Sequence, residues 1–385
     1  MSIYMNNGAT TWPKPECVAG AMYGFLTSGG ANVARGSASK RDLKSLDLVF
    51  SCREELVSLF GGWNEDPRYV SFTANVTESI NVVLKGYLKP GMTVFTSGME
   101  HNAVLRPLRR LESKGVKVEI LPCDEEGFLH PGTLAEAMAR RPDLAIFSHA
   151  SNVCGTIQDI ASLSGICRET GVPMVVDCAQ TAGLLDMNAR ELGLAALCFT
   201  GHKGLFGPQG IGGILWKPEF AERTEWFVEG GTGSFSHLEL QPDAMPDKFE
   251  AGTPNLPGVA GLFAALEWIR ETGIDAIRMR EEALGAQLIE GLLSLPGVLL
   301  SGRKTMDGRL PVFAVNFEGH DNGLIAGRLS EEHGIETRPG LHCAPLAHRT
   351  LGTFPGGALR ISPGYFNTEE DVRATLSALR SILAS

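Results

Sequence analysis

Short apolar stretches alternate with amphipathic stretches between about residues 68 and 216. The apolar stretches have the length of single strands, and the amphipathic ones carry apolar residues at the three- and four-residue spacing of helices. This alternation predicts a largely parallel sheet with helices on both faces. The predicted strands cover residues 68–73, 93–97, 117–122, 144–149, 173–177, 196–200 and 212–216.

A helix-rich stretch follows, and a second series of short strands and helices runs from residue 297 toward the C-terminus, with residues 338–346 as a loop. A length of 385 residues also favours two domains. We expect a large α/β domain over residues 13–258, with a mostly parallel seven-stranded sheet flanked by helices. Residues 1–12 and 259–385 are expected to form a smaller α/β domain.

Composition narrows the possible partners and the cellular compartment. A net charge of −10 argues against nucleic acid, because phosphate binding needs a positive field. The apolar runs are far shorter than the roughly 20 residues that cross a bilayer. Eight scattered cysteines without a C-x-x-C pair favour neither a disulfide framework nor a metal site. We therefore expect a cytoplasmic protein that handles small molecules, with no metal, nucleic-acid or membrane partner.

Two motifs place ionisable residues after predicted strands, where open α/β sheets bind ligands. In TGHKGLFGPQGIGG, Lys203 precedes five glycines within ten residues. The segment could be a surface loop or a phosphate loop, but it lacks the Walker pattern, and Lys203 could instead form a Schiff base. In MVVDCAQ, Asp177 either caps a helix or meets a cation such as the protonated ring nitrogen of pyridoxal phosphate (PLP).

Four further residues outside these two motifs are weaker candidates for a functional site. Thr77 is a candidate N-cap of a helix whose N-terminus could receive a phosphate. His101 and Asn152 each follow a predicted strand, and His101 could stack on a flat ring. Cys343, in RPGLHCAPL, is either packing or a nucleophile once disulfide and metal roles are set aside.

Six motifs occur together in one order: MEHNAV, SNVCGT, VDCAQ, TGHKGLFGPQGIG, FEAGTPN and RPGLHCA. Their order and approximate spacing resemble those of the group II (SUF-type) cysteine desulfurases and selenocysteine lyases of the class V aminotransferase family. The similarity runs from NNGATTWP near the start to LRISPGYFNTEEDV near the end. It implies a PLP-dependent transferase of fold-type I.

The resemblance also implies residue roles. Lys203 would form the Schiff base, His101 would stack on the ring, and Asp177 would pair with the pyridinium nitrogen. Thr253 would reach the phosphate of the partner subunit in a homodimer with shared active sites. The other expected cofactor contacts are Val76 (through its backbone), Thr77, Asn152, Gln180, Thr200 and His202. The expected substrate contacts are Arg35, Asn152, Arg338 and Arg360, with Arg360 holding the carboxylate.

Cys343 would then be the nucleophile that takes sulfur from L-cysteine as a persulfide and leaves L-alanine. His342, Arg338 and Arg360 would help to ionise it. A sulfur-acceptor protein, for instance in iron–sulfur cluster assembly, is the expected partner. The alternatives are a selenocysteine lyase acting on L-selenocysteine, another PLP-dependent C–S lyase or transaminase, and a sulfur-relay docking protein.

Three positions depart from the better-known members of the group. Leu341 replaces a histidine in the cysteine loop, and Ala34 and Ser37 replace two histidines of a substrate-side segment.

Overall fold

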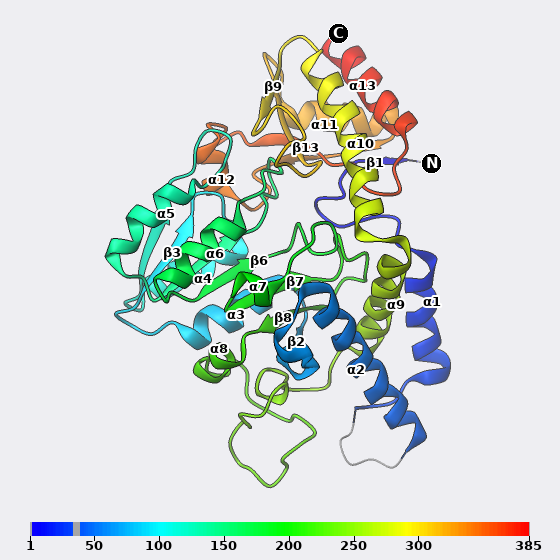
Figure 1. Ribbon diagram of the computed structural model, residues 1–385. Helices are drawn as coiled ribbons and strands as arrows, with labels where there is room; N and C mark the ends of the chain where they lie inside the picture. The colour runs from blue at the N-terminus through cyan, green and yellow to red at the C-terminus, as the bar shows by residue number, and fades with distance from the viewer. Residues whose placement is uncertain (1, 34–38, 385) are drawn as a thin grey trace.

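A seven-stranded sheet forms the centre of the computed structural model, which describes residues 2–33 and 39–384 (Figure 1). Its strand order is β2-β8-β7-β6-β5-β3-β4. The strands from β7 to β4 run parallel, whereas β8 is antiparallel to β7 and β2 is antiparallel to β8. The predicted mostly parallel α/β sheet is therefore confirmed. The strands are β2 (Val70–Thr73), β3 (Thr93–Ser97), β4 (Lys117–Leu121), β5 (Leu144–Ser148), β6 (Met174–Asp177), β7 (Ala196–Thr200) and β8 (Gly212–Trp216).

Helices cover both faces of this sheet because its central strands are apolar on both faces. Phe95, Phe147 and Val176 belong to one buried cluster, and their neighbours Val94 and Ile146 belong to another. The first cluster takes in α2, α5, α6 and α9, and the second takes in α3, α4 and α8. The helices of this part are α1 (Glu16–Gly24), α2 (Lys40–Phe60), α3 (Val76–Tyr87), α4 (Asn102–Glu112), α5 (Pro131–Ala137), α6 (Ile160–Glu169), α7 (Ala189–Leu192), α8 (Pro218–Arg223) and α9 (Leu256–Thr272).

A second, four-stranded sheet of order β12-β13-β10-β9 lies at the upper end of Figure 1. Helices α10, α11 and α13 pack with it around a separate apolar cluster. We propose that this part is the smaller domain. The proposed large domain covers residues 13–258, and the smaller one comprises residues 1–12 and 259–385. Its elements are β9 (Val298–Ser301), β10 (Phe313–Phe317), β11 (Ile335–Glu336), β12 (Arg338–Gly340), β13 (Ala358–Ile361), α10 (Ile274–Leu293), α11 (Asn322–His333), α12 (Pro345–Thr350) and α13 (Glu369–Leu383).

The N-terminal residues join this second part. Strand β1 (Ile3–Tyr4) pairs in parallel with β11, and Asn6 forms a bridge with Ser362. Residues near the two ends of the chain therefore lie side by side.

The segment 338–346, expected to be a loop, is more ordered than its composition suggested. Its first residues form β12, which pairs with β13, and Pro345 opens α12. Proline suits the first turn of a helix because that position needs no N–H donor. Only the short turn that carries His342 and Cys343 is left between the two elements.

Candidate active site

Strand ends bring the candidate cofactor residues to one edge of the large sheet. Asp177 is the last residue of β6, and Thr200 is the last residue of β7. His202 and Lys203 follow β7 directly, and His101 lies immediately before α4. Ligands of open α/β sheets bind at this carboxyl edge.

The Lys203 amine lies where its neutral form is favoured. Burial is the main reason that the pKa of Lys203 falls from 10.5 to about 8, and the positive charges of Arg360 and Arg338 contribute. Asp177 and Cys343 act in the opposite direction. With this pKa a larger fraction of the amine is neutral and nucleophilic near neutral pH than in an ordinary lysine. These electrostatic interactions also place the five side chains in one site.

The buried carboxylate of Asp177 accepts one hydrogen bond from a nearby backbone N–H group. Its Oδ1 accepts the Ala179 N–H at 2.9 Å. Burial raises the pKa of Asp177, while that N–H and the charge of Lys203 oppose the rise. Residues 179–184 are turns and the next helix begins at Ala189, so the helix-cap alternative is wrong. An ionised Asp177 therefore needs a cation at this position.

The first turn of α3 and two buried polar atoms form a candidate phosphate site. Val76 and Thr77 open α3, so their N–H groups have no intrahelical acceptor. Among the described residues, the Thr200 hydroxyl and Nδ1 of His202 are buried without a hydrogen-bond partner. Buried polar atoms are normally paired, so these two fit a phosphate that meets them and the helix N-terminus together.

The N-cap of α3 is Asn75, and the prediction of Thr77 is wrong. The Asn75 side chain accepts the Glu78 N–H at 3.1 Å, which leaves Thr77 inside the first turn. Gly212, which pairs with Thr200, brings β8 against this turn. A Cβ at Gly212 would lie 2.9 Å from Cα of Asn75, so glycine permits the close approach.

His101 caps α4 with its ring. Nδ1 accepts the Ala103 N–H at 3.0 Å, so the proton of the neutral ring is on Nε2. Burial lowers the pKa of His101 to about 4, and the positive charge of Lys203 is the next cause. The ring is therefore an uncharged, oriented plane beside Lys203, as stacking on a flat cofactor requires.

Arg360 lies within β13 and is 1% exposed. Its Nη1 donates to the carbonyl oxygen of Asn152 at 3.0 Å and its Nη2 donates to Oδ1 of Asn6 at 2.9 Å. Its Nε has no partner among the described residues. Burial lowers the pKa of Arg360 to about 10, with Arg338 as the next cause, so the guanidinium remains charged at neutral pH. A buried, incompletely paired guanidinium suits a carboxylate.

The turn with Cys343 has a constrained backbone and presents an exposed thiol. His342 and Cys343 have φ of 48° and 57°, a left-handed region that few non-glycine residues adopt. The Cys343 carbonyl accepts the Asn102 N–H at 2.7 Å, and the His342 carbonyl accepts Nδ2 of Asn152 at 2.7 Å. Asn102 opens α4 and Asn152 lies in the turn after β5, so the Cys343 turn is tied to the carboxyl edge of the large sheet.

His342 does not supply positive charge to Cys343, contrary to expectation. Burial lowers the pKa of His342 to about 3 and that of His348 to about 4. Nδ1 of His342 and Nε2 of His348 lie 3.4 Å apart. The other ring nitrogen of His342 is 2.9 Å from the Arg338 carbonyl oxygen, and that of His348 is 2.7 Å from the Thr353 hydroxyl. His342 therefore adds no positive charge to this turn.

The other seven cysteines differ from Cys343 in their surroundings. Five are buried, Cys123 is partly buried, and Cys17 is the only other exposed one among the described residues. Burial raises the pKa of Cys52 and Cys178, which keeps these thiols protonated.

Two further expected cofactor residues, Gln180 and Thr253, differ in their exposure to solvent. Gln180 is buried and its Nε2 donates to the Gly8 carbonyl at 3.1 Å. Thr253 is exposed and makes no hydrogen bond within the described residues of the chain. Arg35, expected on the substrate side, lies outside the described residues with Ala34 and Ser37.

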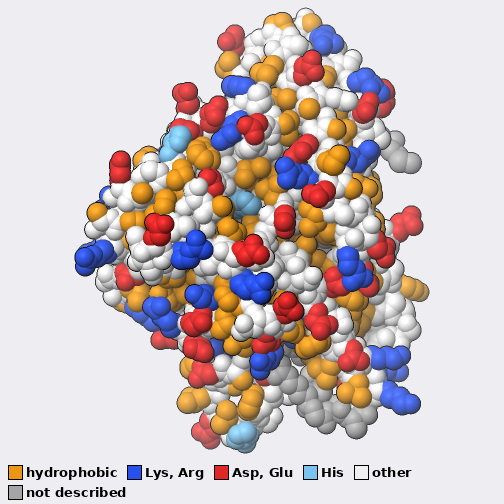
Figure 2. All heavy atoms as spheres, viewed as in Figure 1, with side chains coloured by type: hydrophobic (Ala, Val, Ile, Leu, Met, Phe, Trp, Pro, Cys, Tyr) orange, Lys and Arg blue, Asp and Glu red, His pale blue; other side chains and the backbone are white. Residues whose placement is uncertain are grey.

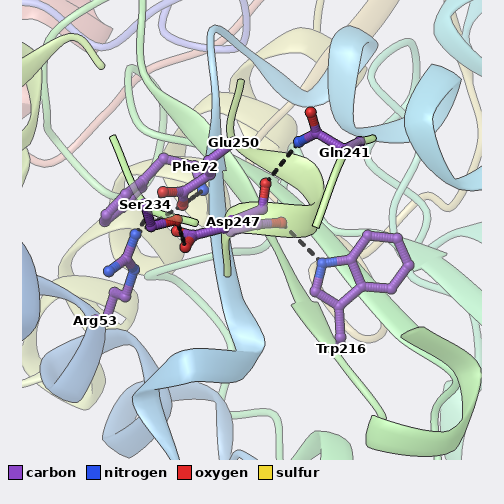
Figure 3. A network of polar contacts seen from close by, with 8 residues as sticks. Arg53, Phe72, Trp216, Ser234, Gln241, Asp247 and Glu250 are labelled. Atoms are coloured by element: carbon purple, nitrogen blue, oxygen red, sulfur yellow. Dashed lines mark hydrogen bonds and ion pairs between the residues drawn. The ribbon is translucent and has the colours of Figure 1, made fainter. Parts of the chain in front are cut away.

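A polar network fixes the segment before Thr253 (Figure 3). Glu250 accepts Nη2 of Arg53 at 2.6 Å and the Phe72 N–H at 2.7 Å. Asp247 accepts the Ser234 hydroxyl, and its carbonyl accepts Nε2 of Gln241 at 2.9 Å. The FEAGTPN segment is thereby anchored to α2 and β2.

One buried residue escaped the sequence interpretation. Glu100 is fully buried and accepts the Ser97 hydroxyl at 2.6 Å, the Ser148 N–H at 3.0 Å and the Ser148 hydroxyl at 2.7 Å. It joins the ends of β3 and β5 directly before His101. The only signal was its place in MEHNAV, since a glutamate after a strand usually faces solvent.

Two features are absent from the described residues. No group of three or more His, Cys, Asp and Glu side chains could hold a metal ion. No helix in this part of the chain has the length and apolar character that a bilayer crossing requires.

Comparisons with known proteins agree with the fold. A probable cysteine desulfurase of Pyrococcus abyssi is 33% identical over 100% of this chain and 94% of its own length. The cysteine desulfurase CsdA of Escherichia coli is 32% identical over 98% of this chain and 93% of its own. A structure of a cysteine desulfurase from Thermococcus onnurineus NA1 superimposes with a TM-score of 0.92 at 30% identity, covering 100% of this chain and 95% of that one. The aminotransferase class-V family matches residues 3–375, and the chain belongs to this family.

Proposed function

We propose that the protein is a PLP-dependent cysteine desulfurase that converts L-cysteine to L-alanine and retains the sulfur on Cys343 as a persulfide. The observation that carries the proposal is that a lysine of lowered pKa interacts electrostatically with a buried carboxyl group, a buried arginine and an exposed cysteine. The similarity to proteins named cysteine desulfurase supports the same reaction.

The residues at the sheet edge fit PLP. The first turn of α3, the Thr200 hydroxyl and Nδ1 of His202 would hold the phosphate, which provides the acceptors that these atoms lack. Asp177 would meet the ring nitrogen, whose positive charge offsets the cost of its burial. His101 would cover the ring. Bound PLP would supply covalent attachment of the substrate amine and an electron sink for the carbon skeleton.

Gln180 and Asn152 are the proposed side contacts of the cofactor. Both are buried, and each already donates one hydrogen bond to a backbone carbonyl, to Gly8 and His342 respectively. Their side chains are therefore oriented before any ligand arrives.

Arg360 would bind the substrate carboxylate. Two of its nitrogens are engaged by the Asn152 and Asn6 oxygens, which fix the guanidinium plane, and Nε is buried without an acceptor. Arg338 pairs with Arg360 across β12 and β13 and would add positive charge. This pair orients the amino acid with its side chain toward Cys343. Arg35 remains a proposed third substrate contact.

Sulfur transfer needs a thiolate that reaches the substrate sulfur. The Cys343 thiolate attacks that sulfur and forms an S–S bond while the substrate Cβ–S bond breaks. The electron pair of the broken bond stays with the carbon skeleton, which gains protons and leaves as L-alanine. A thiolate is the side-chain nucleophile suited to sulfur.

Two related reactions compete with this proposal. L-Selenocysteine has the shape of L-cysteine, so a selenocysteine lyase would use the same residues. A transaminase or another C–S lyase of the family would not need a thiol over the site. The exposed Cys343 on a constrained turn favours desulfuration, and a pure docking role in sulfur relay is disfavoured by the lowered pKa of Lys203.

We further propose a homodimer with shared active sites, a sulfur-acceptor protein and a cytoplasmic location. Thr253 is exposed on an anchored segment, as a residue that reaches the phosphate of the partner subunit would be. Exposed Cys343 is accessible to an acceptor, and reduced thiols suit the cytoplasm.

The test is mass spectrometry of the purified, PLP-loaded protein after brief exposure to L-cysteine. One added sulfur should appear on the peptide that carries Cys343, it should be removable by a reducing thiol, and L-alanine should appear in solution. Alanine release without sulfur on Cys343 would contradict the proposed mechanism.

A further inference from the structure

The carbonyl group of His202, the peptide oxygen directly before Lys203, has an unusual number of donors. It accepts the Thr10 hydroxyl at 3.0 Å and the Thr11 N–H at 3.1 Å, and Nζ of Lys14 donates to it at 2.7 Å. The Thr11 hydroxyl lies 3.3 Å away, but its single proton has a closer acceptor in the Lys203 carbonyl at 3.1 Å. A carbonyl oxygen has two lone pairs, so three donors around one oxygen exceed its normal capacity. The shortest of the three contacts comes from Lys14, which makes it the strongest candidate.

The donors come from a single short segment, residues 6–14, which we call the N-terminal strap. The strap also touches the other end of the site. Oδ1 of Asn6 accepts Nη2 of Arg360 at 2.9 Å, and the Gly8 carbonyl accepts Nε2 of Gln180 at 3.1 Å. One stretch of nine residues thus contacts the peptide before the lysine, a proposed cofactor residue and the proposed carboxylate site.

Lys14 is not an ordinary surface lysine. It is half-buried, and Nζ donates to the Thr11 hydroxyl at 2.6 Å as well as to the His202 carbonyl. Burial lowers its pKa to about 7, with no carboxylate among the described residues to offset the cost. The pKa of His202 is lowered mainly by burial and next by the charge of Lys203, and the charge of Lys14 is the third cause. Near neutral pH the Lys14 amine is therefore about half protonated, and its N–H groups can donate to both oxygens in either state.

We propose that Lys14 is a positioning residue for Lys203. Its ammonium holds the His202 carbonyl, which fixes the peptide from which Lys203 extends, and thus the location of the Lys203 amine relative to Asp177 and Arg360. The proposal deepens the proposed function and rests on it, because a fixed amine matters only if Lys203 binds the cofactor. Lys14 itself touches neither substrate nor cofactor.

Three variants test the proposal in the full-length protein. Lys14→Met removes the ammonium and keeps much of the apolar stem, and Lys14→Arg keeps a cation that can donate to both oxygens. Lys217→Met is the matched control, since Lys217 follows β8 at the opposite edge of the sheet and is also half-buried. The readouts are the affinity of the apoprotein for added PLP, the absorbance spectrum of the bound cofactor, the melting temperature, and kcat and KM for L-cysteine.

We expect Lys14→Met to weaken PLP binding about tenfold, the effect of losing one charge-assisted hydrogen bond. The absorbance maximum should shift, because the amine meets the cofactor in a less defined geometry. The kcat should fall while KM for L-cysteine changes little, since Asn6 still holds Arg360. Lys14→Arg should restore the spectrum and most of kcat, and Lys217→Met should match the wild type.

A purely structural anchor would behave differently. If Lys14→Met lowers only the melting temperature and leaves PLP affinity, spectrum and kcat unchanged, the proposal is wrong. Should Lys14→Met fail to fold, Lys14→Gln removes the ammonium and keeps a neutral amide donor. Weaker PLP binding and a shifted spectrum in Lys14→Gln support the proposal, and unchanged binding and spectrum overturn it.

The wild-type arm separates the two proposals. Suppose that the wild type releases alanine and that Lys14→Met has the wild-type spectrum and kcat. The desulfurase function then stands, and only the proposed role of Lys14 is wrong. A wild-type protein that binds no PLP overturns both.

Discussion

At the scale of single residues, Lys203 is the position whose environment is most specific for chemistry. Lys203→Ala should abolish covalent attachment of PLP while the fold remains, because the side chain is held for its amine rather than for packing. Borohydride reduction followed by peptide mapping should find the cofactor on Lys203 in the wild type and on no lysine in the variant. Lys217→Ala provides the control. Cofactor on another lysine of the wild-type protein would refute the assignment.

Asp177 can be tested by a change that keeps its shape. Asp177→Asn removes the negative charge that would keep the ring nitrogen of PLP protonated, so turnover should fall by orders of magnitude. PLP should still bind, more weakly, because the phosphate contacts are unchanged. Steady-state alanine release and PLP titration measure the two effects. Near-normal turnover would mean that the carboxylate has only a structural role.

Replacing Cys343 should affect the reaction of L-cysteine more than that of L-selenocysteine. Cys343→Ala should bind L-cysteine yet release little alanine, because no thiolate takes the sulfur. The same variant should keep much of its activity on L-selenocysteine, whose C–Se bond is weaker and whose selenolate leaves more readily. Cys17→Ala, the other exposed cysteine, is the control and should behave as the wild type on both substrates. Alanine release from L-cysteine at the wild-type rate would leave Cys343 without a catalytic role.

Residue roles were predictable from sequence only where a motif carried them. Lys203, Asp177 and Cys343 stood out because their types and motifs indicate one chemistry, and the structure brings them together. Thr77 was wrong as an N-cap because Asn75, two positions earlier, competes for the same role. Lys14 could not be found, since its partner is a carbonyl 188 residues away.

At the scale of elements, helix α10 is joined to the segment after β13 by one buried carboxyl group. Oε1 of Glu281 accepts the Tyr365 N–H at 3.0 Å. Burial raises the pKa of Glu281 from 4.5 to about 8, and that N–H opposes the rise. Between pH 4.5 and 8 the folded protein therefore binds more protons at this group than the unfolded chain does. Stability from this group is full below pH 4.5 and is lost as the pH rises toward 8.

Glu281→Gln should remove this pH dependence. Between pH 5.5 and 7.5, the wild type should lose more stability than the variant, by on the order of 2 kcal/mol. Urea unfolding of both proteins at the two pH values measures the difference. Equal changes with pH in the two proteins would show that Glu281 keeps an ordinary pKa when folded.

The strands were the most predictable elements and their arrangement the least. All seven apolar runs of the large sheet became strands because each is short, apolar and bounded by polar residues. The antiparallel placement of β2 beside β8 could not be derived, since an apolar run does not encode its direction or its neighbour. The strand β12 escaped prediction because it contains proline and glycine and is stabilised only by pairing with β13.

At the scale of the whole molecule, exposed apolar side chains gather on the segment between α8 and α9. Phe227, Val228, Phe235, Leu238 and Leu240 are exposed on this segment, which lies at the lower end of Figure 1. In the same view, Figure 2 shows hydrophobic side chains at that end among charged ones. A patch of this kind is typical of a protein interface. It lies on the same segment as Thr253, in keeping with a dimer whose partner completes the site.

The dimer proposal predicts an asymmetry between two exposed leucines. Leu240, 77% exposed on this segment, should tolerate a charge poorly, whereas Leu324, 72% exposed on α11, should accept one. Leu240→Asp should shift the protein toward monomer and weaken PLP binding, and Leu324→Asp should do neither. Size-exclusion chromatography with light scattering gives the mass of each. Dimers of unchanged stability in Leu240→Asp would place the interface elsewhere.

The pairing of the N-terminal strap with the far end of the chain has a consequence for protein synthesis. Asn6 needs Ser362 and Arg360 as partners, and Arg360 is synthesised 354 residues after Asn6. At the usual speed of translation the strap must wait for roughly tens of seconds before these partners exist. The proposed carboxylate site at Arg360 is missing during that time. A nascent chain that has already folded its large sheet is therefore expected to stay inactive until Arg360 and Ser362 have been made.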